Sequence, residues 1–231
     1  MKTKTFILAA CLAAALAAPL SAGIITTGQC AGPSPCTATL DNWSSISNLG
    51  TFLDGVTHNV SGVNNEGETV FTGVLRAAVY RSTVSNRLDF YYQYFNNASS
   101  LDSISQIQME RFGSFTTDVG FTSQDIDGAT GSAGKVNFSQ TGTLQNPSQA
   151  RRPNTNTVLF DFNTAIAPNA QSRILVIRTN ATVYAAGTTT ILNGASATYA
   201  TFAPTDIPEP ATFGILGAGL IALGLVRRQR V

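Results

Sequence analysis

The residues whose types and spacing most clearly serve a chemical purpose are Pro208, Glu209 and Pro210. Each proline fixes the backbone φ angle and removes an amide donor, so we expect this segment to stay out of helices and sheets. An extended backbone without internal hydrogen bonds is the form that a protease binds along its active-site cleft. The sequence therefore predicts a proteolytic recognition site for which this chain is itself the substrate.

An apolar run and a basic cluster follow this segment. Residues 211–226 carry no charge, which predicts a transmembrane helix, and Arg227, Arg228 and Arg230 come directly after it. Arginines at the end of a membrane helix stay on the cytoplasmic side, so everything before Pro208 is expected outside the cytoplasm. A helix of this length spans about 24 Å and is short for a bilayer. Such a helix suits a temporary anchor better than a permanent one.

This order of a Pro-Glu-Pro signature, an apolar helix and an arginine cluster resembles the PEP-CTERM sorting tail of Gram-negative bacterial envelope proteins. The resemblance covers only residues 207–231. It implies that an exosortase, an integral-membrane cysteine protease, recognises the Pro-Glu-Pro residues while the arginines hold the tail at the inner membrane. It also implies release of the body to the cell surface or the exopolysaccharide matrix. The alternative is a C-terminal membrane anchor that is never cut.

The beginning of the sequence also predicts export. Lys2 and Lys4 precede an apolar run over residues 6–20, and small residues follow, which is the pattern of a secretory signal peptide cleaved after Ala22. A lipoprotein signal at Cys11 is disfavoured because the apolar run continues well beyond it. The chain then divides into a signal peptide, a body and a sorting tail at residues 1–22, 23–206 and 207–231.

Two cysteines remain in the body, Cys30 and Cys36, and a short loop with two prolines separates them. Export delivers them to an oxidising compartment, so we predict a disulfide between them. Its stabilisation is expected at the low end of the usual range because a short loop loses little entropy on closure. A metal site is the weaker alternative, since no histidine lies nearby, and we expect neither a metal nor a cofactor.

The composition limits the classes of partner. Charged residues make up 12% of the chain and the formal net charge is +1, against about a quarter charged residues in ordinary globular proteins. Ser, Thr, Asn and Gly take their place, and no basic patch indicates nucleic acid. A surface of this kind suits an exported β protein that meets sugars or other proteins.

The body offers little for catalysis. His58 is the only histidine and no Gly-x-Ser-x-Gly motif is present, so neither a hydrolase triad nor a three-ligand zinc centre is predicted. The acid pairs Glu66 with Glu68 and Asp125 with Asp127 each lie in a turn or loop. We interpret them as solvated acids and not as a glycosidase pair, with calcium at the second pair as a minor alternative. No enzymatic activity is expected.

Aromatic residues support a second functional hypothesis. Trp43, Tyr91 and Tyr94 would stack against sugar rings if the body were an extracellular carbohydrate-binding module. The competing interpretation places the rings of residues 90–95 in the hydrophobic core. Their exposure in the folded protein distinguishes the two.

The elements that must position these residues are predicted to be strands. Period-two alternation and β-prone composition indicate strands at residues 69–82, 88–96, 103–112, 158–162, 173–180, 188–192 and 195–202. The first two should pair as an antiparallel hairpin, and Asn193-Gly194 predicts a type I′ hairpin between the last two. Residues 36–61 are expected to be irregular, and residues 145–155 to form a loop that exposes Arg151 and Arg152.

About nine strands without an amphipathic helix predict an all-β body, an antiparallel β-sandwich of jelly-roll-like or immunoglobulin-like form. The run LDFYYQYFNN also resembles the bodies of PEP-CTERM proteins, which implies the same fold. A signal helix and a transmembrane sorting helix would flank it. The expected function is that of a non-catalytic envelope or matrix protein, with an exosortase as its processing partner and extracellular polysaccharide as a further partner.

Overall fold

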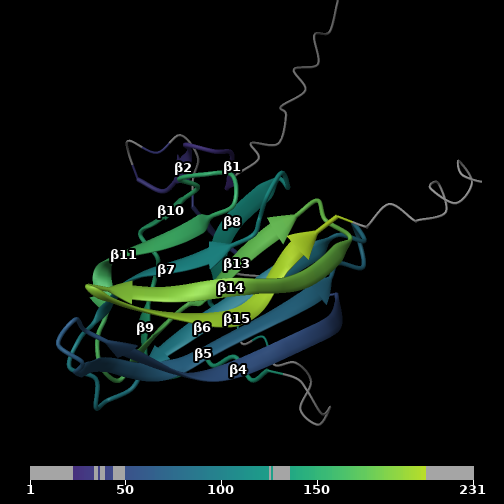
Figure 1. Cartoon of the computed structure of the whole chain (residues 1–231). Helices are drawn as coiled ribbons and strands as arrows, with labels where there is room; N and C mark the ends of the chain where they lie inside the picture. Colours follow the sequence, from purple (N-terminus) through teal and green to yellow (C-terminus); the bar gives the residue numbers. More distant parts are fainter. Residues whose placement is uncertain are drawn as a thin grey trace, which may run out of the picture.

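The computed structural model describes residues 23–33, 36, 40–43, 50–124, 126 and 136–206. Throughout these ranges the chain forms β-strands joined by turns, with no helix (Figure 1). It follows that the described residues include no helix that is long and apolar enough to cross a membrane. The predicted signal helix and sorting helix lie outside the described residues.

The residues that the structure describes form fifteen strands, many of them short. In chain order they are β1 (Ile24–Ile25), β2 (Cys30–Ala31), β3 (Asp41–Asn42), β4 (Thr51–Val63), β5 (Thr69–Arg81), β6 (Leu88–Asn96), β7 (Ile104–Glu110), β8 (Thr117–Thr122), β9 (Thr143–Gln145), β10 (Gln149–Arg151), β11 (Val158–Ile166), β12 (Ala170–Ser172), β13 (Ile174–Thr179), β14 (Val183–Asn193) and β15 (Ala195–Thr205).

The strands belong to one sheet. Its order is β1-β8-β13-β6-β5-β4-β15-β14-β7-β11-β10-β2, with β3, β9 and β12 attached at its sides. All pairs are antiparallel except β3 with β8 and β9 with β12. The two end strands, β1 and β2, contact each other, so the sheet curls into a nearly closed, barrel-like form. The all-β antiparallel prediction is confirmed, whereas the two separate sheets of a sandwich are replaced by one curved sheet.

The joint between β4 and β15 explains why one sheet forms. Ser196 and Val63 are the residue pair in register there, and side chains extend the contact. The His58 Nε2 atom lies 2.7 Å from the carbonyl oxygen of Ala200, and the His58 ring packs beside Tyr199. His58 therefore helps to hold the two halves of the sheet together.

The interior of the curved sheet holds the main hydrophobic core, to which both halves contribute. Its large side chains include Phe71, Phe90, Tyr92, Tyr94, Ile107, Met109, Phe160 and Ile191. A second cluster covers the outer face of β5, β6 and β13 and includes Tyr80, Tyr91, Ile126, Phe138 and Val176. Strand β6 is therefore buried on both faces, in agreement with a sequence in which six of its nine residues are apolar or aromatic.

The predicted hairpin of β5 and β6 is confirmed, with Ala77 opposite Tyr92 in the middle of a long antiparallel pair. The hairpin of β14 and β15 is also present, but its turn differs from the prediction. Asn193 pairs with Ala195, and of the two turn residues only Gly194 has a positive φ, of 66°. A type I′ turn needs positive φ at both central residues, so the turn is centred on Gly194 instead.

Strand β4 contradicts the prediction of irregular structure before residue 61. Its sequence contains Asp54, Gly55 and Gly62, and a register shift between Phe52 and Asp54 interrupts the alternation. The strand forms because β5 pairs with it along its length, so tertiary pairing overrides a weak local preference.

Candidate functional site

The predicted processing site follows the last strand directly. Strand β15 ends at Thr205, and Asp206 is the last residue that the structure describes. Pro208, Glu209 and Pro210, together with the three tail arginines, lie outside the described residues.

The end of β15 is held in place by its neighbours. β15 pairs with β14 along its whole length, up to Val183 opposite Thr205 (Figure 1). Next to this pair, the Tyr184 hydroxyl donates a hydrogen bond of 3.4 Å to Asp54 Oδ2, which connects β14 to β4. The point at which the chain leaves the body is thus fixed relative to the sheet.

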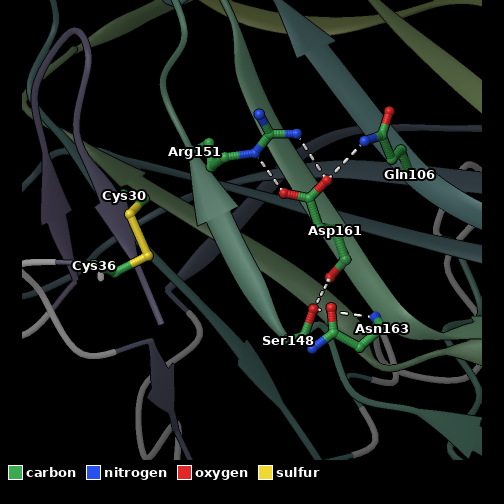
Figure 2. A network of polar contacts seen from close by, with 7 residues as sticks. All are labelled: Cys30, Cys36, Gln106, Ser148, Arg151, Asp161 and Asn163. Carbon is green, nitrogen blue, oxygen red and sulfur yellow. Dashed lines mark hydrogen bonds and ion pairs between the residues drawn. A yellow bond between two sulfur atoms is a disulfide. The ribbon is translucent and has the colours of Figure 1, made fainter. Parts of the chain in front are cut away.

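The predicted disulfide between Cys30 and Cys36 is confirmed. It lies at strand β2, the end strand of the sheet, where Cys30 is directly opposite Arg151 of β10 (Figure 2). Backbone hydrogen bonds from Gly28 to Arg152 and from Arg152 to Gln29, of 2.7 and 3.0 Å, continue this pairing beyond the strand. The disulfide therefore restrains an edge of the sheet that is held by few other bonds.

A polar network occupies the outer face beside this edge (Figure 2). The carboxylate of Asp161 accepts hydrogen bonds from Arg151 Nε at 2.6 Å, Arg151 Nη2 at 2.9 Å and Gln106 Nε2 at 2.8 Å. The Ser148 hydroxyl donates to the Asp161 carbonyl oxygen at 3.0 Å and accepts from the Asn163 amide at 3.1 Å. Side chains from β7, β10 and β11 are thereby tied together.

The Arg151 and Asp161 pair is only partly shielded from solvent, with side-chain exposures of 40% and 18%. The hydrogen bond to Asp161 raises the pKa of Arg151. Both oxygens of Asp161 are already engaged, so this carboxylate serves as a fixed acceptor and is poorly placed to act as a general base. A shallow depression lies over the network and is lined by Ser105, Gln106, Gln149, Arg151, Asp161 and Asn163.

Arg152, the next residue, is buried, and the prediction that it is exposed was wrong. Only 4% of Arg152 is accessible. Its guanidinium donates to the carbonyl oxygens of Phe115 at 2.8 Å and Thr155 at 2.7 Å, and also to that of Gly113. Burial lowers its pKa. The side chain organises the loops beside β8 and β10 and is not available to a partner.

A second polar cluster, which the sequence analysis missed, lies on the outer face of β6, β13 and β8. Arg178 of β13 is directly opposite Asp89 of β6 and Asp118 of β8. Its Nε atom lies 3.7 Å from Asp89 Oδ2, and its guanidinium carbon lies 4.1 Å from the centre of the Trp43 ring. The Oδ1 atom of Asp118 is buried and accepts no hydrogen bond from any described residue.

Both carboxyl groups of this cluster bind protons more tightly than usual. Burial raises the pKa of Asp89 to about 6, although Arg178 opposes the shift. Burial raises the pKa of Asp118 to about 7, again against Arg178, while the Asp41 and Asp89 carboxylates add to the increase. The sequence carries a faint indication of this, because each of the three residues is a lone charge between core-facing neighbours. Their meeting depends on a strand order that local patterns do not reveal.

The proposed sugar-stacking residues are not presented to solvent as that hypothesis requires. Tyr91 and Tyr94 are both fully buried, at 0% accessibility, so neither ring is available to a sugar. Trp43 is partly buried against the outer core, with Arg178 over one face of its ring. The interpretation of the aromatic strand as core is the one that the structure supports.

Within the described ranges no group of three or more His, Cys, Asp or Glu side chains is placed to hold a metal ion. Glu66 and Glu68 lie in the predicted turn, where the Asn64 side chain accepts hydrogen bonds of 2.9 Å from both of their amides. Asp125 and Asp127 lie outside the described residues, so the calcium alternative at that pair stays a prediction.

A comparison with protein families identifies the tail. Residues 206–230 match the model of the PEP-CTERM protein-sorting motif. The chain carries a PEP-CTERM sorting motif. This motif implies exosortase-dependent sorting of a secreted protein that is transiently anchored in the membrane. No curated protein and no solved structure matches the chain.

The PEP-CTERM match begins at Asp206, one residue after β15 ends at Thr205. All of the strands that the structure describes therefore precede the matched motif in the chain.

Proposed function

We propose that this protein is a non-catalytic component of the cell envelope or of the exopolysaccharide matrix, released from the inner membrane by an exosortase-type protease. The observation that carries the proposal is the PEP-CTERM motif directly after the last strand of the body. A cut near Pro208 would detach the membrane-binding segment and leave the sheet intact. The protein would then act through the surface of its body.

Two features of the body agree with service outside the cytoplasm. The Cys30–Cys36 disulfide is stable in oxidising compartments. The outer face of β7, β10 and β11 carries amide, carboxylate and guanidinium groups that are bonded to one another, as in the set formed by Gln106, Asp161 and Arg151. A surface of this kind is suited to contact with hydrated polymers or other proteins.

The sorting part of the proposal is tested by changing Glu209→Ala and Pro210→Ala together in the native host. We expect the product to keep the mass of the uncut tail and to stay in the inner-membrane fraction, because the protease no longer recognises it. Thr212→Ala, just beyond the signature, is the matched control and should leave processing intact. An unchanged mature mass and location in the double variant would show that the Pro-Glu-Pro residues do not direct sorting.

A second candidate function is binding of extracellular polysaccharide, and the depression over Arg151, Asp161 and Gln106 favours it. Planar, hydrogen-bonding side chains held in fixed positions are well suited to sugar hydroxyls, and this surface does not depend on the buried tyrosines. Co-sedimentation of the purified body with the host's exopolysaccharide tests it. Arg151→Ala with Gln106→Ala should weaken binding, whereas Arg111→Ala, at an exposed arginine elsewhere, should not.

A further inference from the structure

The first residue of the body lies against the Asp118 carboxylate. The Val119 amide donates a hydrogen bond of 3.0 Å to the Gly23 carbonyl oxygen, and the neighbouring Ile24 pairs with Asp118 in the β1–β8 ladder. A methyl group built on the α-carbon of Gly23 would lie 2.4 Å from Asp118 Oδ1. The nitrogen of Gly23 is bonded to that same α-carbon, so the carboxylate lies beside the first atoms of the body.

The surroundings of Asp118 contain more negative than positive charge. The charged groups that face it are Asp41 from β3, Asp89 from β6 and Arg178 from β13. Arg178 is shared with Asp89, from whose Oδ2 its Nε lies 3.7 Å away. Asp118 Oδ1 is buried and lacks a hydrogen-bond donor among the described residues. Buried carboxylates of this kind are normally matched by a cation or a donor, so the geometry calls for one more positive group.

We propose that Asp118 is the binding site for the α-ammonium group that removal of the signal peptide creates on Gly23. This inference rests on the export step of the proposed function. The predicted cut after Ala22 makes Gly23 the first residue of the mature chain and puts the new charge on the α-carbon that adjoins Asp118 Oδ1. Asp118 thereby recognises the processed end of the protein, which an uncut chain cannot supply.

The covalent step balances with water as its only co-reactant. Hydrolysis breaks the peptide bond between Ala22 and Gly23; the hydroxyl of water goes to the Ala22 carbonyl carbon and a proton goes to the Gly23 nitrogen. An α-amino group has an ordinary pKa of about 7.7–8.0, so it takes up a further proton near neutral pH. The resulting ammonium carries three donors and a full positive charge, whereas the Gly23 amide of the uncut chain carries one neutral donor that forms no hydrogen bond with Asp118 Oδ1.

An ion pair between the Gly23 ammonium and Asp118 would hold β1 in place, which is a two-residue strand at one end of the sheet. Besides its bonds to β8, it contacts β2 at the other end of the curled sheet. Fixing the mature terminus to Asp118 therefore holds the strand at which the sheet comes closest to closing. A side chain has no room at Gly23, because its first carbon would lie 2.4 Å from Asp118 Oδ1 and 2.5 Å from the Val119 carbonyl oxygen.

Amine acylation of the exported, mature protein tests the inference. Lys135 is the only lysine after Lys4, so the mature body has two amines, and the Lys135 side chain serves as an internal reference. The ammonium bound to Asp118 should have a raised pKa and react slowly at pH 7. We expect Asp118→Asn to increase acylation of Gly23 relative to Lys135 about tenfold, which corresponds to one unit of pKa. The matched control Asp102→Asn should leave the ratio unchanged.

A measurement on the unaltered protein covers the case in which Asp118→Asn fails to fold. The pH dependence of Gly23 acylation gives the pKa of its α-amino group directly, and a value above 8 supports the pairing. An ordinary value, or an acylation ratio unaffected by Asp118→Asn, would overturn it. A mature chain that begins at another residue would also overturn it, while the sorting claim, which is read at the opposite end of the chain, would stand.

Discussion

Arg151 of β10 binds the carboxylate of Asp161 on β11 through two hydrogen bonds, of 2.6 and 2.9 Å. On its other side Arg151 lies opposite Cys30 of β2, whose sulfur is bonded to Cys36. One residue thus connects the network on the outer face to the disulfide at the end of the sheet. The edge formed by β11, β10 and β2 is held by the Arg151–Asp161 ion pair, by the Cys30–Cys36 disulfide and by a small number of backbone hydrogen bonds.

Loss of the disulfide should destabilise this edge moderately. Closing so short a loop removes little entropy from the unfolded chain, so we expect replacement of Cys30 and Cys36 by serine to lower the free energy of unfolding by about 2 kcal/mol. Urea denaturation of the purified body measures it. The control is the unaltered body with dithiothreitol, which should reproduce the loss, and a fall of several times this size would mean that the bond supports more than the edge.

The ion pair should contribute less than the disulfide because it is partly exposed. We expect Arg151→Ala to lower the free energy of unfolding by about 1 kcal/mol, near the upper end for exposed pairs, since the two bonds are well aligned. A double-mutant cycle with Asp161→Asn measures the coupling between the two residues. Arg151→Lys should recover only part of it, because an ammonium cannot donate two parallel bonds. Simple additivity of Arg151→Ala and Asp161→Asn would contradict the prediction.

Asp89 should make the body less stable as the pH rises towards neutrality. Its pKa in the folded protein is about 6, above the ordinary value of about 3.9, so the folded state holds the proton more tightly. The stabilisation is fully present below about pH 4 and is lost as the pH rises through 6. We expect Asp89→Asn to flatten the change in melting temperature between pH 4 and 7. Asp102→Asn, the control, should leave the slope unchanged.

If Asp89→Asn instead steepened the slope, the carboxyl group would be ionised at low pH and the Arg178 pair would outweigh its burial. Asp118 contributes a dependence of the same sign as Asp89 in a chain that still carries residues before Gly23, since burial raises its pKa as well. An ammonium bound to Asp118 would remove the contribution of Asp118 to this pH dependence. The melting temperatures of mature and unprocessed chains should therefore change differently with pH.

Gly120 allows β3 to lie against β8. A methyl group at Gly120 would lie 2.6 Å from the backbone oxygen of Asp41 and 3.2 Å from the Trp43 ring. We expect Gly120→Ala to displace β3. The free energy of unfolding should fall by about 1–2 kcal/mol, because the hydrogen bonds of β3 and the Trp43–Arg178 contact are weakened. Trp43 is the only tryptophan, so the tryptophan fluorescence of the folded variant reports on β3. We expect its emission maximum to shift to the red, because the ring becomes more exposed to water.

The control for that experiment is Gly62→Ala, whose methyl group would meet the Phe71 ring at 2.1 Å, within β4 and β5. It should lower stability without shifting the emission of the folded state. An unshifted emission in Gly120→Ala would mean that β3 stays in place and that the strand accommodates the methyl group.

The strands that could be predicted from sequence are those whose local pattern agrees with their place in the fold. β5 and β6 alternate strongly and are adjacent in both chain and sheet, so their pairing follows from their short connection. β4 and β8 could not be predicted in this way. β4 is rich in polar residues and glycine and depends on β5, while β8 lies between β1 and β13, strands distant from it in sequence.

The same distinction separates the parts of the candidate site. The Pro-Glu-Pro tail and the disulfide are contiguous or nearly so, and local patterns therefore indicate them. Asp89, Asp118 and Arg178 come from three separate strands and meet only when β13 is inserted between β6 and β8. Tyr91 and Tyr94 illustrate the opposite difficulty, because an aromatic strand has the same sequence whether its rings are exposed or covered by another layer.

The short distance between the end of β15 and the sorting motif bears on the orientation that the body can take at the membrane. An extended chain advances at most about 3.6 Å per residue, so Pro208 is within about 11 Å of the end of the strand at Thr205. If the proposed cut is near Pro208, a membrane-embedded protease would reach it with the Thr205 end of the body facing the membrane, and the direction of β15 would then set the orientation of the body during cleavage.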